Sequence, residues 1–153
     1  MSHASMPAVR TTIALALAAA LVASPMLVGR AEAKTTGKER RLAQIVNRAR
    51  ESRGLGPLKL NDKMTRKAHS HSVTMASHRT IFHSSCLTCH SPKPTMHAMG
   101  ENVARAGGLK AAHRNLMRSS SHRGNILCSC YKAMGIGVVK RGGKVYVTQI
   151  FWG

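Results

Sequence analysis

The stretch Ser121-His122-Arg123-Gly124-Asn125-Ile126-Leu127 decides how this sequence is interpreted, together with the shorter stretches Phe82-His83-Ser84 and Gly100-Glu101-Asn102 that precede it. Each of the three stretches contributes one imidazole or carboxylate, the side chains that carry most proton-transfer and metal chemistry. None of them is long enough to define a fold alone. Their order along the chain is the specific feature.

The residues before these stretches predict two amphipathic helices. Thr36 and Glu39 match a capping box, and apolar side chains follow at helical spacing as far as a stop near Gly54. Asn61 and Asp62 are suitable caps for a second helix. The apolar positions of the two helices are Leu42, Ile45, Val46 and Ala49 in the first, and Met64, Ala68, His71 and Met75 in the second.

The rest of the chain changes from loops and short helices to strands. Residues 80–98 and 119–124 are expected to be loops, and short helices are expected over 101–105 and 109–117. Alternating apolar residues on either side of Arg141-Gly142-Gly143-Lys144 predict a β-hairpin at the C-terminus. Helices followed by strands indicate an α+β fold.

The three stretches resemble the bacterial branch of the CAP superfamily, which contains cysteine-rich secretory proteins, antigen 5 and pathogenesis-related 1 proteins; its domain is also called the SCP domain. The similarity covers nearly all of residues 38–152. It implies a three-layer α-β-α sandwich with a small antiparallel sheet and a C-terminal hairpin. It also implies a central groove into which His83, Glu101 and His122 project.

The chain departs from the family pattern at two positions. The family's usual set of two histidines and two acids lacks its second acid, because no Asp or Glu follows Glu101. Leu116 stands where bacterial relatives often have Trp. The missing acid removes the obvious general base, so we assign no catalytic residue and favour a role without catalysis.

Two interpretations of His83, Glu101 and His122 remain open. Two imidazoles and a carboxylate are the ligand set of an open site for Zn²⁺ or a similar divalent metal. Alternatively, the three side chains form a buried hydrogen-bonded network that ties loops together, since an unpaired glutamate in a groove would be costly. Of the other histidines, His71 is expected in the core, and the surface set is His69, His78, His97 and His113.

The four cysteines are Cys86, Cys89, Cys128 and Cys130. In an oxidising compartment the expectation is two disulfides, and we expect each cysteine of the first pair to bond to one of the second, because a bridge within Cys128-Ser129-Cys130 would be strained. One alternative is a zinc site made of all four sulfurs. Another is covalent attachment of a c-type haem at Cys86-Leu87-Thr88-Cys89-His90.

The N-terminus has the features of a secretory signal peptide. Arg10 precedes an apolar run over residues 13–23, and Ala31-Glu32-Ala33 fits a cleavage site. We therefore expect a signal peptide at 1–33, a short linker at 34–37 and a CAP/SCP domain at 38–153. Without the signal peptide, 22 Lys and Arg stand against 4 Asp and Glu, which gives a formal charge of +18.

Export and charge together suggest a secreted protein, extracellular or periplasmic, held at an anionic cell-wall polymer or lipid surface. The expected groove ligand is a small apolar molecule or a divalent metal, and the expected state is a monomer. Nucleic acid is not expected, because the chain is exported and its five aromatic residues form no stacking platform. The alternatives are a metal-dependent hydrolase of an envelope polymer or peptide, and a c-type haem protein.

Overall fold

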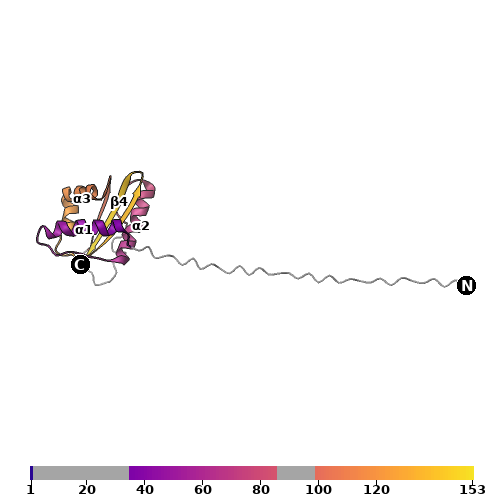
Figure 1. Cartoon of the computed structure of the whole chain (residues 1–153), viewed down its shortest axis with the longest axis horizontal. Coiled ribbons are helices and arrows are strands. Elements are labelled where there is room, and N and C mark those ends of the chain that lie inside the picture. The colour runs from indigo at the N-terminus through magenta and orange to yellow at the C-terminus, as the bar shows by residue number, and fades with distance from the viewer. Residues whose placement is uncertain (2–34, 86–98) are drawn as a thin grey trace. The chain divides into compact units, whose positions relative to one another are not determined.

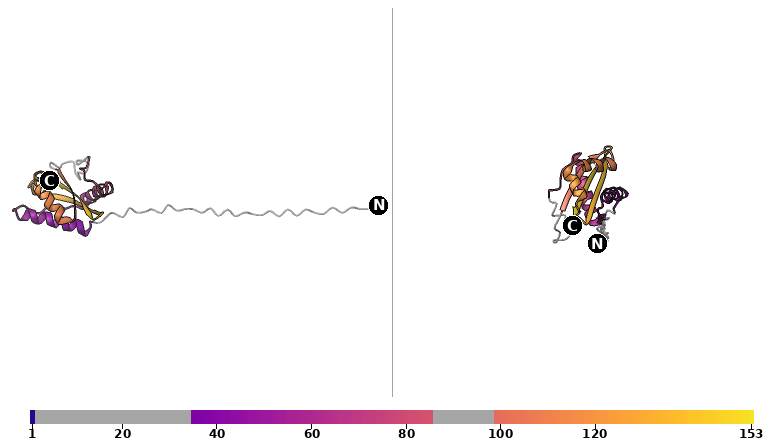
Figure 2. Two further views of the ribbon diagram at one scale, coloured as in Figure 1. Left: turned by 90° about the horizontal axis from the view of Figure 1, so that it is seen from above. Right: turned by 90° about the vertical axis from the view of Figure 1, so that its left-hand side faces the viewer.

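In the part of the chain that the structure describes, four strands form one sheet with helices against both of its faces (Figures 1 and 2). The structure is a computed structural model that describes Met1 and residues 35–85 and 99–153. The expected signal peptide lies outside the described residues except for Met1. Cys86, Cys89 and His97 lie outside them as well. The part from Glu32 to Gly153 is one compact unit.

The two predicted amphipathic helices are confirmed. Helix α1 spans Gly37–Glu51 and begins with the predicted capping box, in which the Thr36 N–H donates to Glu39 Oε2 at 2.7 Å and the Glu39 N–H donates to Thr36 Oγ1 at 3.4 Å. Helix α2 spans Asp62–His78 and is capped by Asn61, whose Oδ1 accepts from the Met64 N–H at 3.0 Å. Both caps satisfy backbone donors that the first helical turn leaves unpaired.

The sheet has the strand order β1-β3-β4-β2, with β1 at Lys59–Leu60, β2 at Met99–Ala106, β3 at Ala133–Arg141 and β4 at Lys144–Trp152. Strands β3 and β4 form the predicted hairpin, which turns through Gly142 and Gly143 at φ values of 54° and 70°. All pairings are antiparallel except the two-residue parallel pairing of β1 with β3. Because β2 comes last in the strand order, it lies at an edge of the described sheet.

Residues of β4 alternate between two cores. Tyr146, Ile150 and Trp152 pack with residues of α2 such as Met64 and Met75 on one face. On the other face lies the larger core, to which α1, α3 (Leu109–Arg118) and α4 (Ser120–Leu127) contribute. This alternation is the two-residue period of a strand buried on both sides, and it gives the expected three-layer α-β-α arrangement.

Helix α2 lies very close to the sheet because β3 presents glycines to it. A Cβ atom at Gly137 would lie 2.1 Å from the carbonyl oxygen of Ala68, and one at Gly135 would lie 2.5 Å from the carbonyl carbon of Met64. No side chain fits at either position without moving the helix. The two glycines thus fix the separation between α2 and the sheet.

Two local predictions are wrong. Residues 101–105 belong to strand β2, because eight consecutive residues from Met99 to Ala106 pair with β4. This long-range pairing overrides the helix propensity of Glu and Ala. Residues 120–127 form helix α4 instead of a serine-rich loop, and Leu109–Arg118 confirms the helix expected before it.

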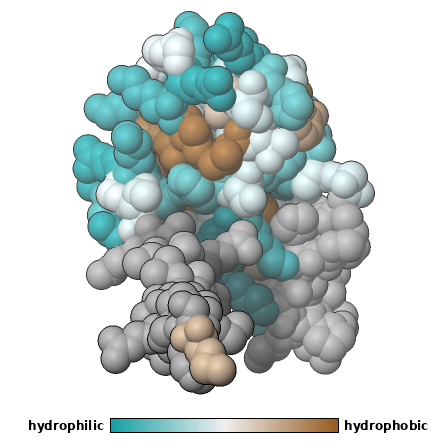
Figure 3. Space-filling model, turned by 90° about the vertical axis from the view of Figure 1, so that its right-hand side faces the viewer, coloured by the Kyte–Doolittle hydropathy of each residue, from teal (hydrophilic) through white to brown (hydrophobic). Residues whose placement is uncertain are grey.

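The α+β fold class is confirmed. None of the helices within 35–85 and 99–153 has the length and apolar content needed to cross a membrane. The face in Figure 3 is mostly hydrophilic and carries a limited hydrophobic patch.

Candidate functional site

Glu101 is the centre of the candidate site. Its side chain, on edge strand β2, is only 3% exposed, and its oxygens accept three hydrogen bonds from the segment that follows α2. His83 Nδ1–H and the Ser84 N–H donate to Oε1 at 2.8 and 2.9 Å, and the Ser84 hydroxyl donates to Oε2 at 2.6 Å. These donors compensate for the burial of the carboxylate.

Two side-chain amides, from buried Asn102 and half-buried Asn125, join the second and third stretches. Asn102, which is fully buried, donates to the His122 carbonyl at 3.0 Å and to Gln149 Oε1 at 3.1 Å. Asn125 on α4 donates to the Glu101 carbonyl at 3.2 Å and to Asn102 Oδ1 at 3.0 Å. The Asn125 amide thus satisfies a backbone carbonyl of the edge strand β2.

The glycine before Glu101 allows this close approach. A Cβ atom at Gly100 would lie 2.5 Å from the Tyr131 hydroxyl and 2.7 Å from Asn125 Oδ1. Any larger residue would therefore force the Tyr131 and Asn125 side chains to move. In the Gly100-Glu101-Asn102 stretch, the glycine permits the packing, the glutamate binds the segment after α2, and the asparagine binds α4.

His83 and His122 approach each other across the edge of the sheet. Their ring centroids are 6.3 Å apart, and the ring planes are inclined by 22°. His83 follows α2 on one face, whereas His122 is on α4, which packs on the other face. They can meet because β2 has no further strand beside it in the described sheet. The three residues predicted from sequence therefore lie together.

The pKa values of two site residues shift in directions that keep Glu101 charged and His122 neutral. Burial raises the pKa of Glu101, but hydrogen bonds from the Ser84 hydroxyl and N–H and from His83, with the charge of His71, bring it below the ordinary value. Burial, and then repulsion from His83, lower the pKa of His122. A neutral imidazole is the form that binds a metal or accepts a proton.

A groove of about 480 Å³ opens beside His83. Its lining comes from the outer side of α2 and from the segment after it: Lys67, Ser70, His71, Thr74, Phe82, His83, Ser84 and Ser85. Phe82 is 38% exposed, so its aromatic ring is accessible in the groove. The groove offers one aromatic surface among hydroxyls and imidazoles.

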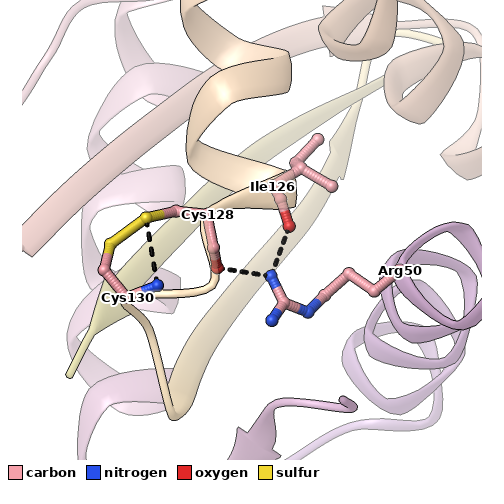
Figure 4. Close-up of a disulfide and its surroundings, with 4 residues drawn as sticks. All are labelled: Arg50, Ile126, Cys128 and Cys130. Atoms are coloured by element: carbon pink, nitrogen blue, oxygen red, sulfur yellow. Dashed lines mark hydrogen bonds between the residues drawn. A yellow bond between two sulfur atoms is a disulfide. The ribbon is translucent and has the colours of Figure 1, made fainter. Parts of the chain in front are cut away.

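Helix α4 is held in place by a buried arginine. Arg50 of α1 is 2% exposed, and its Nη1 donates to the carbonyls of Ile126 and Cys128 at 2.8 and 2.9 Å (Figure 4). Its Nε donates to the Gly56 carbonyl at 2.9 Å. A cation at the C-terminal end of a helix is favourable because the carbonyls there carry partial negative charge. Arg50 therefore orients the helix that carries His122 and Asn125.

The expected pairing of the cysteines is wrong. Cys128 and Cys130 form a disulfide with each other, so neither is joined to Cys86 or Cys89 (Figure 4). The chain bends directly after α4 and brings the two Cα atoms within 5.2 Å, inside the usual range for a disulfide. The bridge also removes two of the four thiolates that a four-cysteine zinc site requires. The expected haem attachment at 86–90 lies outside the described residues.

Three other histidines differ from expectation. His71 is half-buried and lines the groove instead of the core, with its Nε2 donating to the Phe82 carbonyl at 2.8 Å. His69 is half-buried and donates to the buried Glu39 at 2.7 Å. His113 is half-buried, and burial followed by repulsion from Arg53 lowers its pKa. His78 is exposed, as predicted.

Sequence reasoning assigned no role to Ser84, Asn102, Asn125 or Gln149, although the first three are in the stretches that suggested the family. Nothing in the spacing alone shows that their side chains bond to one another. Asn102 gives one signal, because a polar residue within an edge strand must find partners when it is buried.

No group of three or more His, Cys, Asp and Glu side chains is placed to hold a metal ion in the described part of the chain. Glu101 already accepts three hydrogen bonds, and His83 uses Nδ1 for one of them. The remaining ring nitrogen of His83 and the imidazole of His122 are the groups left at the site to bind a ligand.

The fold and the site define a CAP domain of the bacterial type. The model of the cysteine-rich secretory protein family matches residues 43–151, which is well over half of the chain, and the chain belongs to this family. A relative, the Bacillus subtilis protein YkwD, which is described as uncharacterized, is 28% identical over 122 residues. That match covers 73% of this chain and 46% of YkwD, so the chain spans less than half of that relative's length.

Solved structures give the same result for the fold. An outer surface protein from Borrelia burgdorferi has a TM-score of 0.68 at 17% identity, over 77% of this chain and 93% of that protein. A cysteine-rich secretory protein from Staphylococcus aureus has a TM-score of 0.63 at 27% identity, over 75% of this chain and 38% of that one. An extracellular SCP-domain protein from Bacillus anthracis has a TM-score of 0.63 at 23% identity, over 76% of this chain and 40% of that one.

The lowered pKa of Glu101 predicts how acid affects stability. A carboxylate whose pKa is lower in the folded state than in the unfolded state stabilises the folded state at pH values above the unfolded-state pKa. This contribution is lost as the pH falls through the folded-state pKa. Glu101→Gln is expected to lower the free energy of unfolding at pH 7 by about 1–3 kcal/mol, and the difference from wild type is expected to shrink toward pH 3. Urea denaturation of wild type and Glu101→Gln between pH 7 and pH 3 measures the loss at pH 7 and its decrease toward acid pH.

The matched control is Glu51→Gln, which removes the same charge from an exposed position at the end of α1. It is expected to change the free energy of unfolding by less than about 0.5 kcal/mol. A difference between wild type and Glu101→Gln that is equally large at pH 7 and pH 3 would contradict the role given to the charged carboxylate.

Proposed function

We propose that this chain acts outside the cell as a non-catalytic binding protein of the bacterial envelope. The family supports this proposal, as do the relatives described as an outer surface protein and as an extracellular protein. The expected signal peptide at 1–33 supports export to an extracellular or periplasmic location. The proposed function has two parts: a groove binds a ligand, and a basic surface retains the protein at the envelope.

The groove beside His83 is the observation that carries the first part. It has a volume of about 480 Å³, which is within the range of small-molecule sites. Exposed Phe82 gives it an apolar surface, and His71 packs edge-on against that ring at a centroid distance of 5.2 Å. Such a surface bordered by hydroxyls suits a small apolar or amphipathic molecule.

The pair of imidazoles formed by His83, which lines the groove, and His122 beside it suits a second candidate ligand, a divalent metal such as Zn²⁺. His83 and His122 would hold it, and Glu101 would orient His83 through the Nδ1–H bond, which is the usual role of a carboxylate behind a metal-binding histidine. A bound metal would supply a Lewis acid for an oxygen atom of the ligand. Glu101 keeps the His83 tautomer whose Nε2 lone pair faces away from the carboxylate.

A zinc titration tests the metal interpretation. Wild type is expected to bind one zinc ion per chain, and His122→Ala is expected to bind it at least about tenfold more weakly, because one of two protein donors is lost. Calorimetry and metal content after dialysis provide the measurement. His113→Gln on α3 is the control, and its zinc affinity is expected to equal that of wild type. Equal zinc content in wild type and His122→Ala would rule out this site.

The second part rests on charge. Residues 34–153 carry a formal charge of +18. A charge of this size attracts anionic polymers and lipid surfaces at long range. A monomer retained on an anionic wall polymer or lipid surface is the arrangement that we propose.

Retention on purified wall fragments, or on vesicles that contain anionic lipid, tests this part. Retention is expected to fall steeply with added salt, because the screening length shrinks from about 10 Å at 0.1 M to about 3 Å at 1 M. Neutral vesicles are the control and are expected to retain little protein at any salt concentration. Retention that is unchanged by salt would contradict an electrostatic attachment.

A metal-dependent hydrolase is less well supported. Such an enzyme needs a general base near the metal. Of the acids after residue 33, Glu39 is bonded to His69, Asp62 accepts from Thr35, and Glu51 is exposed on α1. Glu101 alone is at the site, where it already accepts three hydrogen bonds.

A further inference from the structure

Three arginines from separate parts of the chain line one hollow at the far end of the sheet. Arg79 ends helix α2, Arg105 is on strand β2, and Arg141 ends strand β3 at the hairpin turn. Together with Gly142 and Tyr146, they surround a volume of about 270 Å³. One water molecule occupies about 30 Å³ in the liquid, so the hollow has room for a phosphate-sized group.

The backbone and an aromatic ring hold this arrangement in place. Arg79 has φ 55° and ψ 23°, and among the described residues it is the only non-glycine residue with a positive φ. This left-handed conformation is uncommon for a residue with a Cβ atom. The guanidinium carbon of Arg105 lies 5.6 Å from the centre of the Tyr146 ring, and the Tyr146 side chain is itself fully buried. A cation over an aromatic face is stabilised there without a carboxylate.

The three guanidinium groups have no acidic partner among the residues that the structure describes. None of the described residues that line the hollow has a carboxylate. All four acids after residue 33 are described, and they lie elsewhere: Glu39 and Asp62 are near the start of α1 and α2, Glu51 is at the end of α1, and Glu101 is bonded to His83 and Ser84. Arg79, Arg105 and Arg141 are exposed, and like charges that line one hollow without an acidic partner repel each other, so a bound anion would offset that repulsion.

We propose that Arg79, Arg105 and Arg141 form a binding site for a dianionic phosphate group, either inorganic phosphate or a phosphomonoester. Guanidinium groups present planar pairs of donors that match the oxygens of phosphate, and such charge-assisted bonds are among the strongest in proteins. A phosphate group carries a charge of about −1.5 to −2 at pH 7. A phosphodiester has a single negative charge and would be bound less tightly.

This site is separate from the groove at His83. Glu101 and Arg105 are on the same strand, four residues apart, which corresponds to about 13 Å along the strand. The lining residues of the two hollows do not overlap. The phosphate site therefore does not depend on the groove ligand, and changes at one position are expected to leave the other intact.

A phosphate titration of isotope-labelled protein, followed by NMR, tests the proposal. Inorganic phosphate is expected to shift the backbone amide signals of Arg79, Arg105 and Arg141 in a saturable way. Arg79→Gly removes the guanidinium at a position whose φ suits glycine, so the variant is expected to fold at least as well as wild type. Arg79→Gly and Arg105→Gln are each expected to weaken binding about tenfold or more, the effect of losing a hydrogen bond to a charged group.

The matched control is Arg114→Gln, which removes one exposed arginine from α3 and lowers the net charge equally. Its phosphate affinity is expected to remain within about twofold of wild type, because exposed charges far from a site are screened. An equal loss of affinity in Arg114→Gln and Arg79→Gly would overturn the proposal, since net charge would then explain the binding. Absence of saturable shifts at the three arginines would overturn it as well.

Two further titrations identify the source of the phosphate group. Glycerol phosphate represents a soluble phosphomonoester, and vesicles that contain phosphatidic acid represent a lipid headgroup. If the protein binds soluble phosphate and also binds the vesicles in a way that depends on Arg79, the site exists and its ligand is the lipid headgroup. If the protein binds soluble phosphate but shows no Arg79-dependent binding of vesicles, the site exists and its ligand is a free phosphomonoester. Binding of vesicles without any binding of soluble phosphate overturns it.

Discussion

The burial of the Glu101 carboxylate is the constraint on which the site depends. A charged group that is 3% exposed must find donors, and it finds three of them in the segment that leaves α2. Its donors connect the α2 layer to the edge strand and bring His83 to the edge of the sheet. The same strand turns Asn102 toward the opposite layer, where Asn102 binds the His122 carbonyl. One edge strand thus holds both histidines through adjacent side chains.

The opposite layer depends on a buried cation in the same way. Arg50 donates to carbonyls at the end of α4 and to the Gly56 carbonyl. Helix α4 contributes fully buried Ile126 and half-buried Leu127 to the larger core, so few of its own side chains fix its position by apolar packing. Arg50 and the Asn125 amide supply the orientation that packing does not, and they fix the place of His122 relative to Glu101.

Sequence predicts those features that local chemistry decides. The capping box at Thr36 and Glu39, the α2 stripe and the C-terminal hairpin follow from residue type and spacing, and the resemblance to the CAP family brings His83, Glu101 and His122 together. Long-range contacts decide the rest. Residues 101–105 become a strand by pairing with β4, and α4 forms because Arg50 and Asn125 hold it. The Cys128–Cys130 bridge depends on a bend that residue spacing does not show.

The hydrogen bond from the half-buried Ser84 hydroxyl to the buried Glu101 carboxylate is expected to stabilise the folded state. A double-mutant cycle with Ser84→Ala, Glu101→Gln and the double variant, analysed by urea denaturation at pH 7, tests it most directly. The sum of the two single losses is expected to exceed the loss in the double variant, with a coupling of about 1–2 kcal/mol. Losses that add to within about 0.3–0.5 kcal/mol would contradict it, because independent sites behave in that way.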